Sequence, residues 1–97
     1  MNTKETVLST LRNLTPTLKR DYHVESLALF GSIARSKPHP KSDIDLLVDF
    51  RAEATLFDLV GLGLFLEEQL RQKVDIVPQE SLRAEIKDTV LQELIRI

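Results

Sequence analysis

Gly31 and Ser32 form the first of two short motifs whose residue types and spacing could support chemistry. The apolar run 27–30 stops at Gly31, which lacks a Cβ and therefore permits a tight turn and a close backbone approach to a ligand. Ser32 then opens a short helical turn, and the first amides of a helix point outward and carry partial positive charge. The two residues are therefore predicted to bind phosphate, with the serine hydroxyl as a further donor.

Carboxylates supply the second motif. Asp43 follows Ser32 after ten intervening residues, and Asp45 leads into the apolar segment 46–48. Residues two apart in a strand share a face, so both acids should project together while Ile44 points into the core. Two carboxylates this close repel each other unless a cation lies between them, and a hard divalent ion such as Mg²⁺ is the expected one.

A third carboxylate, Asp75, lies in the β-branched segment 74–77. If this segment pairs beside the strand of Asp45, a cluster of three carboxylates is complete. A phosphate site that faces three acids suggests nucleotidyl transfer, in which two metal ions can stabilise the attacking and leaving oxygens at phosphorus. Asp43, Asp45 and Asp75 are therefore the predicted metal ligands and catalytic residues, and Asp75 is expected to help activate the attacking hydroxyl.

The order of these motifs, Gly31-Ser32, then Asp43-x-Asp45, then Asp75 on a later strand, resembles the polymerase-β-type nucleotidyltransferase superfamily. The small size is similar to that of the minimal nucleotidyltransferases, the MntA-type antitoxins encoded beside HEPN-domain toxins. The resemblance covers nearly the whole chain. It implies a protein adenylyltransferase that uses Mg²⁺ and transfers AMP from ATP to a hydroxyl of the toxin. Tyrosine is the expected acceptor, the modified ribonuclease is silenced, and a hetero-oligomer with the toxin is expected.

The segment between the two motifs departs from the pattern of this superfamily. Ser36 stands where members usually carry glycine, and the proline-containing segment 37–40 follows. Arg35 is the strongest candidate for a contact with the triphosphate, because it lies about one helical turn after Gly31 and a guanidinium can bind phosphate oxygens bidentately. Lys37 and Lys41 are weaker candidates, and a solvated loop of ordinary charge is the alternative.

Length and composition limit the other possibilities. The 97 residues allow a single small domain over residues 1–97, and a domain of this size buries only about two-thirds of its unfolded surface. A net charge of −2, from 13 basic and 15 acidic residues, does not indicate direct binding of nucleic acid. The absence of cysteine excludes disulfides and thiolate metal sites. Without a long apolar run or a leader, we expect no membrane association and a cytoplasmic location.

Hydrophobic periodicity predicts a mixed α/β fold, and the resemblance implies a nucleotidyltransferase fold. We expect a small sheet of about four strands, backed by helices on one face. Helix starts are predicted at Thr3, at Thr15 with Pro16 in the first helical position, at Thr55 with Asp58 completing a capping box, and at Ser81. The expected strands are 27–30, 46–48, 74–77 and an edge strand at 95–97.

The predicted helix from Thr55 to Gln72 is more apolar than one buried face requires. The surplus lies around Phe57, Leu64 and Phe65, and it is either covered by other helices or forms a protein interface. Gly61 and Gly63 each weaken a helix by about 1 kcal/mol relative to alanine, which suggests that something packs closely against the backbone there.

Three further titratable residues receive no role in the chemistry. His23 has no accompanying acid or nucleophile motif and is interpreted as structural. Asp58 is explained by the start of its helix, and Asp49 lies at the far end of its strand.

Two other functions stay open at this point. The domain could neutralise its toxin by binding alone, through the apolar helix surface. It could also modify a small hydroxylated molecule such as an antibiotic, in which case a partner chain would have to supply the substrate-binding domain.

Overall fold

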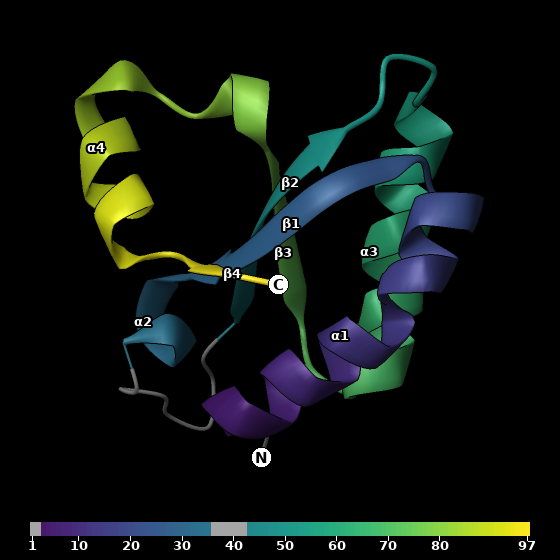
Figure 1. The fold of residues 1–97 in the computed structure, drawn as a ribbon, viewed down its shortest axis with the longest axis horizontal. Helices are drawn as coiled ribbons and strands as arrows, with labels where there is room; N and C mark the ends of the chain where they lie inside the picture. The colour runs from purple at the N-terminus through teal and green to yellow at the C-terminus, as the bar shows by residue number, and fades with distance from the viewer. Residues whose placement is uncertain (1–2, 36–42) are drawn as a thin grey trace.

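A four-stranded mixed sheet forms the centre of the structure, a computed structural model that describes residues 3–35 and 43–97 (Figure 1). The strands are β1 (Val24–Phe30), β2 (Ile44–Phe50), β3 (Val74–Pro78) and β4 (Ile95–Arg96). Their spatial order is β3-β2-β1-β4, with β1 antiparallel to both of its neighbours and β2 parallel to β3. The predicted mixed α/β fold with about four strands is confirmed, and so is the edge strand near Ile95.

Helices surround this sheet on different sides. They are α1 (Lys4–Asp21), α2 (Gly31–Ala34), α3 (Leu56–Leu70) and α4 (Ala84–Glu93), and a short 3₁₀ turn covers Gln79–Ser81. Figure 1 shows α2 and α4 next to each other on the left, with α3 on the opposite side of the molecule. Within the described residues, no helix has the length and apolar character needed to cross a membrane.

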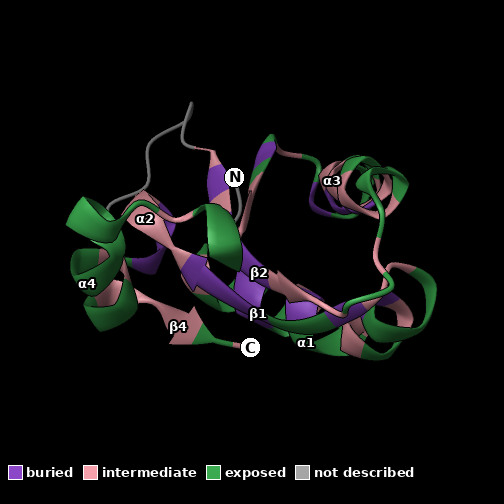
Figure 2. Cartoon of the chain, turned by 90° about the horizontal axis from the view of Figure 1, so that it is seen from above, coloured by how far each residue is buried: buried purple, intermediate pink, exposed green. Residues whose placement is uncertain are grey.

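Alternation along the central strands separates a core face from a second face of the sheet. Ile44, Leu46 and Val48 of β2 are fully buried and belong to the core cluster, together with Leu11 of α1 and Leu62 of α3. Figure 2 shows the buried residues concentrated in β1 and β2. Because side chains in a strand alternate between faces, the residues between these apolar positions project to the other side of the sheet, away from this cluster.

α1 is one continuous helix, so the prediction of a second helix starting at Thr15 is wrong. Leu11 and Leu18 lie two turns apart on one face and both are fully buried, so continuing the helix past Pro16 buries both side chains. The Thr15 hydroxyl donates a hydrogen bond of 2.9 Å to the carbonyl oxygen of Leu11 instead of capping a new helix. The predicted N-cap at Thr3 is confirmed, because its Oγ1 accepts from the amide of Thr6 at 3.1 Å.

α3 begins with the predicted capping box between Thr55 and Asp58. The predicted close packing is found at Gly61, where a Cβ would lie 3.2 Å from the Tyr22 ring. At Gly63 a Cβ would lie 3.8 Å from Ile76, which is an ordinary contact distance and does not require glycine. Phe65 stacks on Tyr22 with ring centroids 5.4 Å apart. Four large apolar side chains of α3 are exposed: Leu56, Phe57, Val60 and Leu64. Of the three positions predicted to carry surplus apolar surface, Phe65 is therefore covered by Tyr22, whereas Phe57 and Leu64 are exposed to solvent.

The last helix starts later than predicted. Ser81 ends the 3₁₀ turn, and α4 begins at Ala84 without a side-chain cap, so the prediction of a cap at Ser81 is wrong. The 3₁₀ turn uses the residues that follow Pro78, and Leu82 and Arg83 are extended before the helix begins. None of the α4 residues is buried, and Ile86 and Leu91 are 48% and 39% exposed.

Candidate active site

Asp45 and Asp75 are brought together by the parallel pairing of β2 with β3. The two residues are direct partners in the register, and their neighbours Ile44 and Val74 are paired and buried. Residues paired across two strands project to the same face, so both carboxylates lie side by side on the face opposite the core cluster. Asp43 stands one residue before β2 rather than within it.

The charges of the three acids act on one another at Asp45. The pKa of the Asp45 carboxyl is raised to about 6, mainly by burial and then by the negative charges of Asp75 and Asp43, while Arg35 opposes the shift. A carboxyl with a pKa in this range is mostly ionised at neutral pH, but it takes up a proton more readily than an ordinary aspartate. This electrostatic coupling indicates that the three predicted residues form one cluster around Asp45.

Gly31 lies directly against this cluster. It follows Phe30, the partner of Asp45 in the register of β1 with β2, and its φ of +79° is in the left-handed region that favours glycine. A Cβ at this position would collide with the Asp45 carboxylate, with 3.0 Å to its carboxyl carbon. Two independent reasons therefore favour glycine at this position: the positive φ of the turn, and the lack of space for a Cβ beside the Asp45 carboxylate. Ser32 is the next residue of α2, at the start of the turn.

Arg35 is held at the end of the same turn. Its amide donates to the Gly31 carbonyl oxygen at 3.1 Å, and its Nη1 donates to Glu93 Oε2 of α4 at 2.9 Å. The predicted phosphate contacts at Lys37 and Lys41, and the departure from the superfamily pattern at Ser36, lie outside the described residues.

Residues without a predicted role in the chemistry have structural partners or lie apart. His23 Nδ1 is 3.1 Å from Asp58 Oδ2, and His23 has a φ of 56°. The pKa of Asp58 is lowered mainly because the Thr55 amide donates to its carboxylate, with a further contribution from His23. Asp49 is four residues along β2 from Asp45, a distance of about 13 Å at the rise of a strand.

The three carboxylates match a divalent cation by their chemistry. Hard oxygen ligands suit Mg²⁺, and a cation between the acids would relieve the repulsion that raises the pKa of Asp45. In residues 3–35 and 43–97, no three carboxylate, histidine or cysteine side chains converge as a ready metal site in their present conformations. Binding a shared ion would therefore require other side-chain torsions in Asp43, Asp45 and Asp75.

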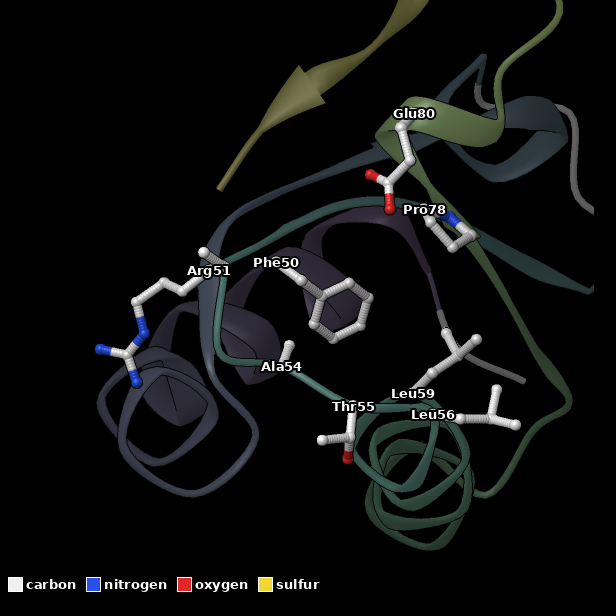
Figure 3. A pocket seen from close by; sticks show the side chains of 9 residues that line it. Phe50, Arg51, Ala54, Thr55, Leu56, Leu59, Pro78 and Glu80 are labelled. Atoms are coloured by element: carbon white, nitrogen blue, oxygen red, sulfur yellow. The ribbon is translucent and has the colours of Figure 1, made fainter.

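A pocket of about 370 Å³ lies elsewhere, between the start of α3 and the far ends of β2 and β3 (Figure 3). Phe50, Leu59 and Pro78 give it an apolar wall, and Glu80 is its acidic residue. Phe50 is five residues from Asp45 along β2, or about 16 Å at the rise of a strand. The pocket is therefore separate from the carboxylates, and we assign it no part in the chemistry.

Comparison with known proteins decides the family. The nucleotidyltransferase domain family matches residues 11–97. The chain belongs to this family. Relatives of this nucleotidyltransferase include the protein adenylyltransferase MntA of Thermococcus cleftensis, which is 34% identical over 97 residues that cover 100% of this chain and 98% of the relative. A candidate protein adenylyltransferase of Methanocaldococcus jannaschii is 35% identical over 98 residues, and the match covers 100% of both chains.

Solved structures agree with this assignment of the nucleotidyltransferase. The structure of a candidate minimal nucleotidyltransferase has a TM-score of 0.84 and 35% identity, and the match covers 99% of this chain and 97% of that chain. A toxin–antitoxin crystal structure with AMP-PNP contains a chain with a TM-score of 0.70 and 26% identity, and this match covers 87% of our chain and 69% of that chain. The family predicted from the motif spacing is confirmed.

Sequence reasoning missed Glu93. It lies 58 residues from Arg35 in the chain, on a helix with no recognisable motif, and only the fold brings the two side chains together. The one available signal is an acid in the last turn of a helix, where the negative end of the helix dipole disfavours it.

Proposed function

We propose that this nucleotidyltransferase is the antitoxin of a toxin–antitoxin pair and transfers AMP from ATP to a hydroxyl of its HEPN-domain toxin. Tyrosine is the expected acceptor. The observation that carries the proposal is the pairing of Asp45 with Asp75 beside the Gly31 turn, because phosphoryl chemistry needs acids and a phosphate site next to each other. The relative named protein adenylyltransferase MntA and the toxin–antitoxin structure with AMP-PNP support the choice of substrate and partner.

In this proposal the turn at Gly31 binds the nucleotide. The backbone amides of Gly31 and Ser32 and the serine hydroxyl donate to phosphate oxygens, and Arg35 adds a charged donor. α2 has only four residues, so individual amide donors rather than a long helix dipole supply the binding. The close approach of the turn to Asp45 supports this proposal, because phosphates bound at the turn would lie next to the carboxylates.

The carboxylates supply the chemistry. Asp43, Asp45 and Asp75 would hold Mg²⁺, which when bound offsets their negative charge and that of the phosphates. Asp75 accepts the proton of the acceptor hydroxyl. The hydroxyl oxygen forms a bond to the α-phosphorus, the bond from that phosphorus to the α,β-bridging oxygen breaks, and pyrophosphate leaves. The product is a phosphodiester between AMP and the toxin, and the modified ribonuclease is inactive.

Intact mass spectrometry of the toxin tests the proposal. The HEPN-domain toxin of the proposed pair is incubated with ATP, Mg²⁺ and either the wild type, the Asp43→Asn/Asp45→Asn double variant or Asp49→Asn. We expect a mass gain in whole AMP units with the wild type and with Asp49→Asn, which keeps the cluster, and none with the double variant. A gain that persists with the double variant would contradict the assignment of these acids.

The alternatives predict different outcomes of the same experiment. A stable complex without any mass gain would favour neutralisation by binding, for which the exposed α3 side chains Leu56, Phe57, Val60 and Leu64 offer a surface. A small hydroxylated substrate would leave the toxin unchanged and would consume ATP only when a partner chain that binds this substrate is present.

A further inference from the structure

Glu93 connects the last helix to the proposed phosphate site. Its Oε2 accepts a hydrogen bond of 2.9 Å from Arg35 Nη1, and both side chains are partly exposed. Glu93 is the final residue of α4, where the negative end of the helix dipole disfavours a carboxylate. Stability of the helix therefore does not explain an acid at this position, whereas the contact with Arg35 does.

The position of Glu93 is fixed by elements close to the Gly31 turn. β4 begins two residues after Glu93, and Ile95 pairs with Leu29 of β1. Leu29 lies two residues before Gly31, and α2 contacts α4 directly. Figures 1 and 2 both show α4 beside α2. The pairing of β4 with β1 therefore keeps Glu93 and Arg35 close to each other.

Arg35 stays next to the Gly31 turn while it is paired with Glu93. The Arg35 amide donates to the Gly31 carbonyl oxygen at 3.1 Å, and Gly31 lies directly against the Asp45 carboxylate, so Arg35 is one helical turn from the acids while its guanidinium is bonded to Glu93. Only Nη1 is used by Glu93, and a guanidinium has five N–H donors in a planar fork. The Glu93 contact therefore does not use all of the guanidinium donors, and a second anion can bind to the others.

We propose that Glu93 is a positioning residue, which holds the Arg35 guanidinium in the orientation that binds the triphosphate of ATP. The proposal rests on the proposed function, because ATP is the ligand. Glu93 itself does not contact the nucleotide. It limits the rotamers of a long side chain, which lowers the entropy lost when Arg35 binds phosphate.

A double-mutant cycle in nucleotide affinity tests the proposal. Calorimetric titration with α,β-methylene-ATP and Mg²⁺ is carried out on the wild type, Glu93→Ala, Arg35→Gln and the double variant. We expect Arg35→Gln to weaken binding about 10- to 100-fold and Glu93→Ala about 2- to 5-fold. In the Arg35→Gln background, Glu93→Ala should have no further effect. Asp88→Asn, which removes an exposed acid from the same helix, is the matched control and should bind like the wild type.

Several results would overturn the proposal. Tighter binding by Glu93→Ala would show that Glu93 competes with the nucleotide for Arg35, and an equal loss in both backgrounds would show that Glu93 acts through the fold. Unchanged binding by Glu93→Ala would exclude the role while leaving the proposed function intact. No binding by the wild type would overturn both. Far-ultraviolet circular dichroism of each variant separates a local effect from unfolding.

Discussion

The surroundings of Asp45 disfavour the ionised form of its carboxyl. Its folded pKa of about 6 lies above the ordinary value of 3.8, because it is partly buried and faces two other acids. A group with a raised folded pKa contributes stability at low pH, where it is protonated in both states, and loses that contribution as the pH rises through the folded pKa. The ion-free protein therefore loses stability as the pH rises from about 4 through about 6, and this loss stays at its full size at higher pH.

Asp45→Asn should stabilise the protein in the absence of divalent ions. The gain should be small at pH 4, grow through pH 6 and level off above pH 7. Since the side chain is partly exposed, solvent screening reduces the expected gain to about 1 kcal/mol in the free energy of unfolding. Urea unfolding with EDTA at several pH values measures it. Asp49→Asn is the control on the same strand, and a loss of stability by Asp45→Asn that is equal at all pH values would contradict the prediction.

α3 has two different faces along one helix. Leu62, Leu66 and Leu70 are buried against the sheet, while Phe57 is 89% exposed. Both faces are made of large apolar residues, so composition alone does not distinguish them. The difference comes from the sheet, which covers one side of the helix only.

Alanine substitutions at two positions of α3 should have very different costs. Leu62→Ala removes a fully buried side chain and should lower the free energy of unfolding by about 2–5 kcal/mol. Phe57→Ala should change it by no more than about 0.5 kcal/mol, because the ring has few contacts to lose. Chemical unfolding of both variants measures this. A large loss for Phe57→Ala that depends on protein concentration would instead show that the ring is packed in a self-associated form.

Local signals predicted these elements well, and long-range packing explains the errors. The N-cap at Thr3, the capping box at Thr55 and the turn at Gly31 each depend on a few adjacent residues, so the sequence contains the whole signal. At Thr15 the local signal for a new helix was outweighed by the burial of Leu11 and Leu18. The cluster at Asp45 could be predicted because Asp45 leads into an apolar strand and Asp75 lies in a β-branched one. The partner of Arg35 could not, because pairing of β4 with β1 creates that contact.

At the scale of the whole molecule, the chain is packed unevenly. α1 and α3 share the core with the sheet, whereas α4 has no buried residue and is connected through Glu93, its contact with α2 and the two-residue strand β4 (Figure 2). The least buried helix is thus the one that lies beside the proposed phosphate site. Low burial allows local opening with a small free-energy cost.

Hydrogen exchange should reveal this difference. The amides of α4 should exchange on the order of 100-fold or more faster than those of α3 around Leu62 and Leu66, because α4 can open without exposing the core. Exchange followed by mass spectrometry on peptides from both helices measures it, with α1 as a second reference. Equal protection in α3 and α4 would mean that α4 opens only when the whole domain unfolds.

The stack of Tyr22 on Phe65 gives this protein a spectroscopic property. Tyr22 is the only tyrosine and the chain has no tryptophan, so a single side chain dominates its intrinsic fluorescence. That ring lies at the end of α1, against Gly61 and Phe65 of α3. The ultraviolet emission of the unlabelled protein therefore reports on the docking of these two helices. It offers a label-free signal for folding, and this signal comes from a part of the molecule away from the carboxylates. Binding of a nucleotide at the carboxylates would have to be measured with a separate probe.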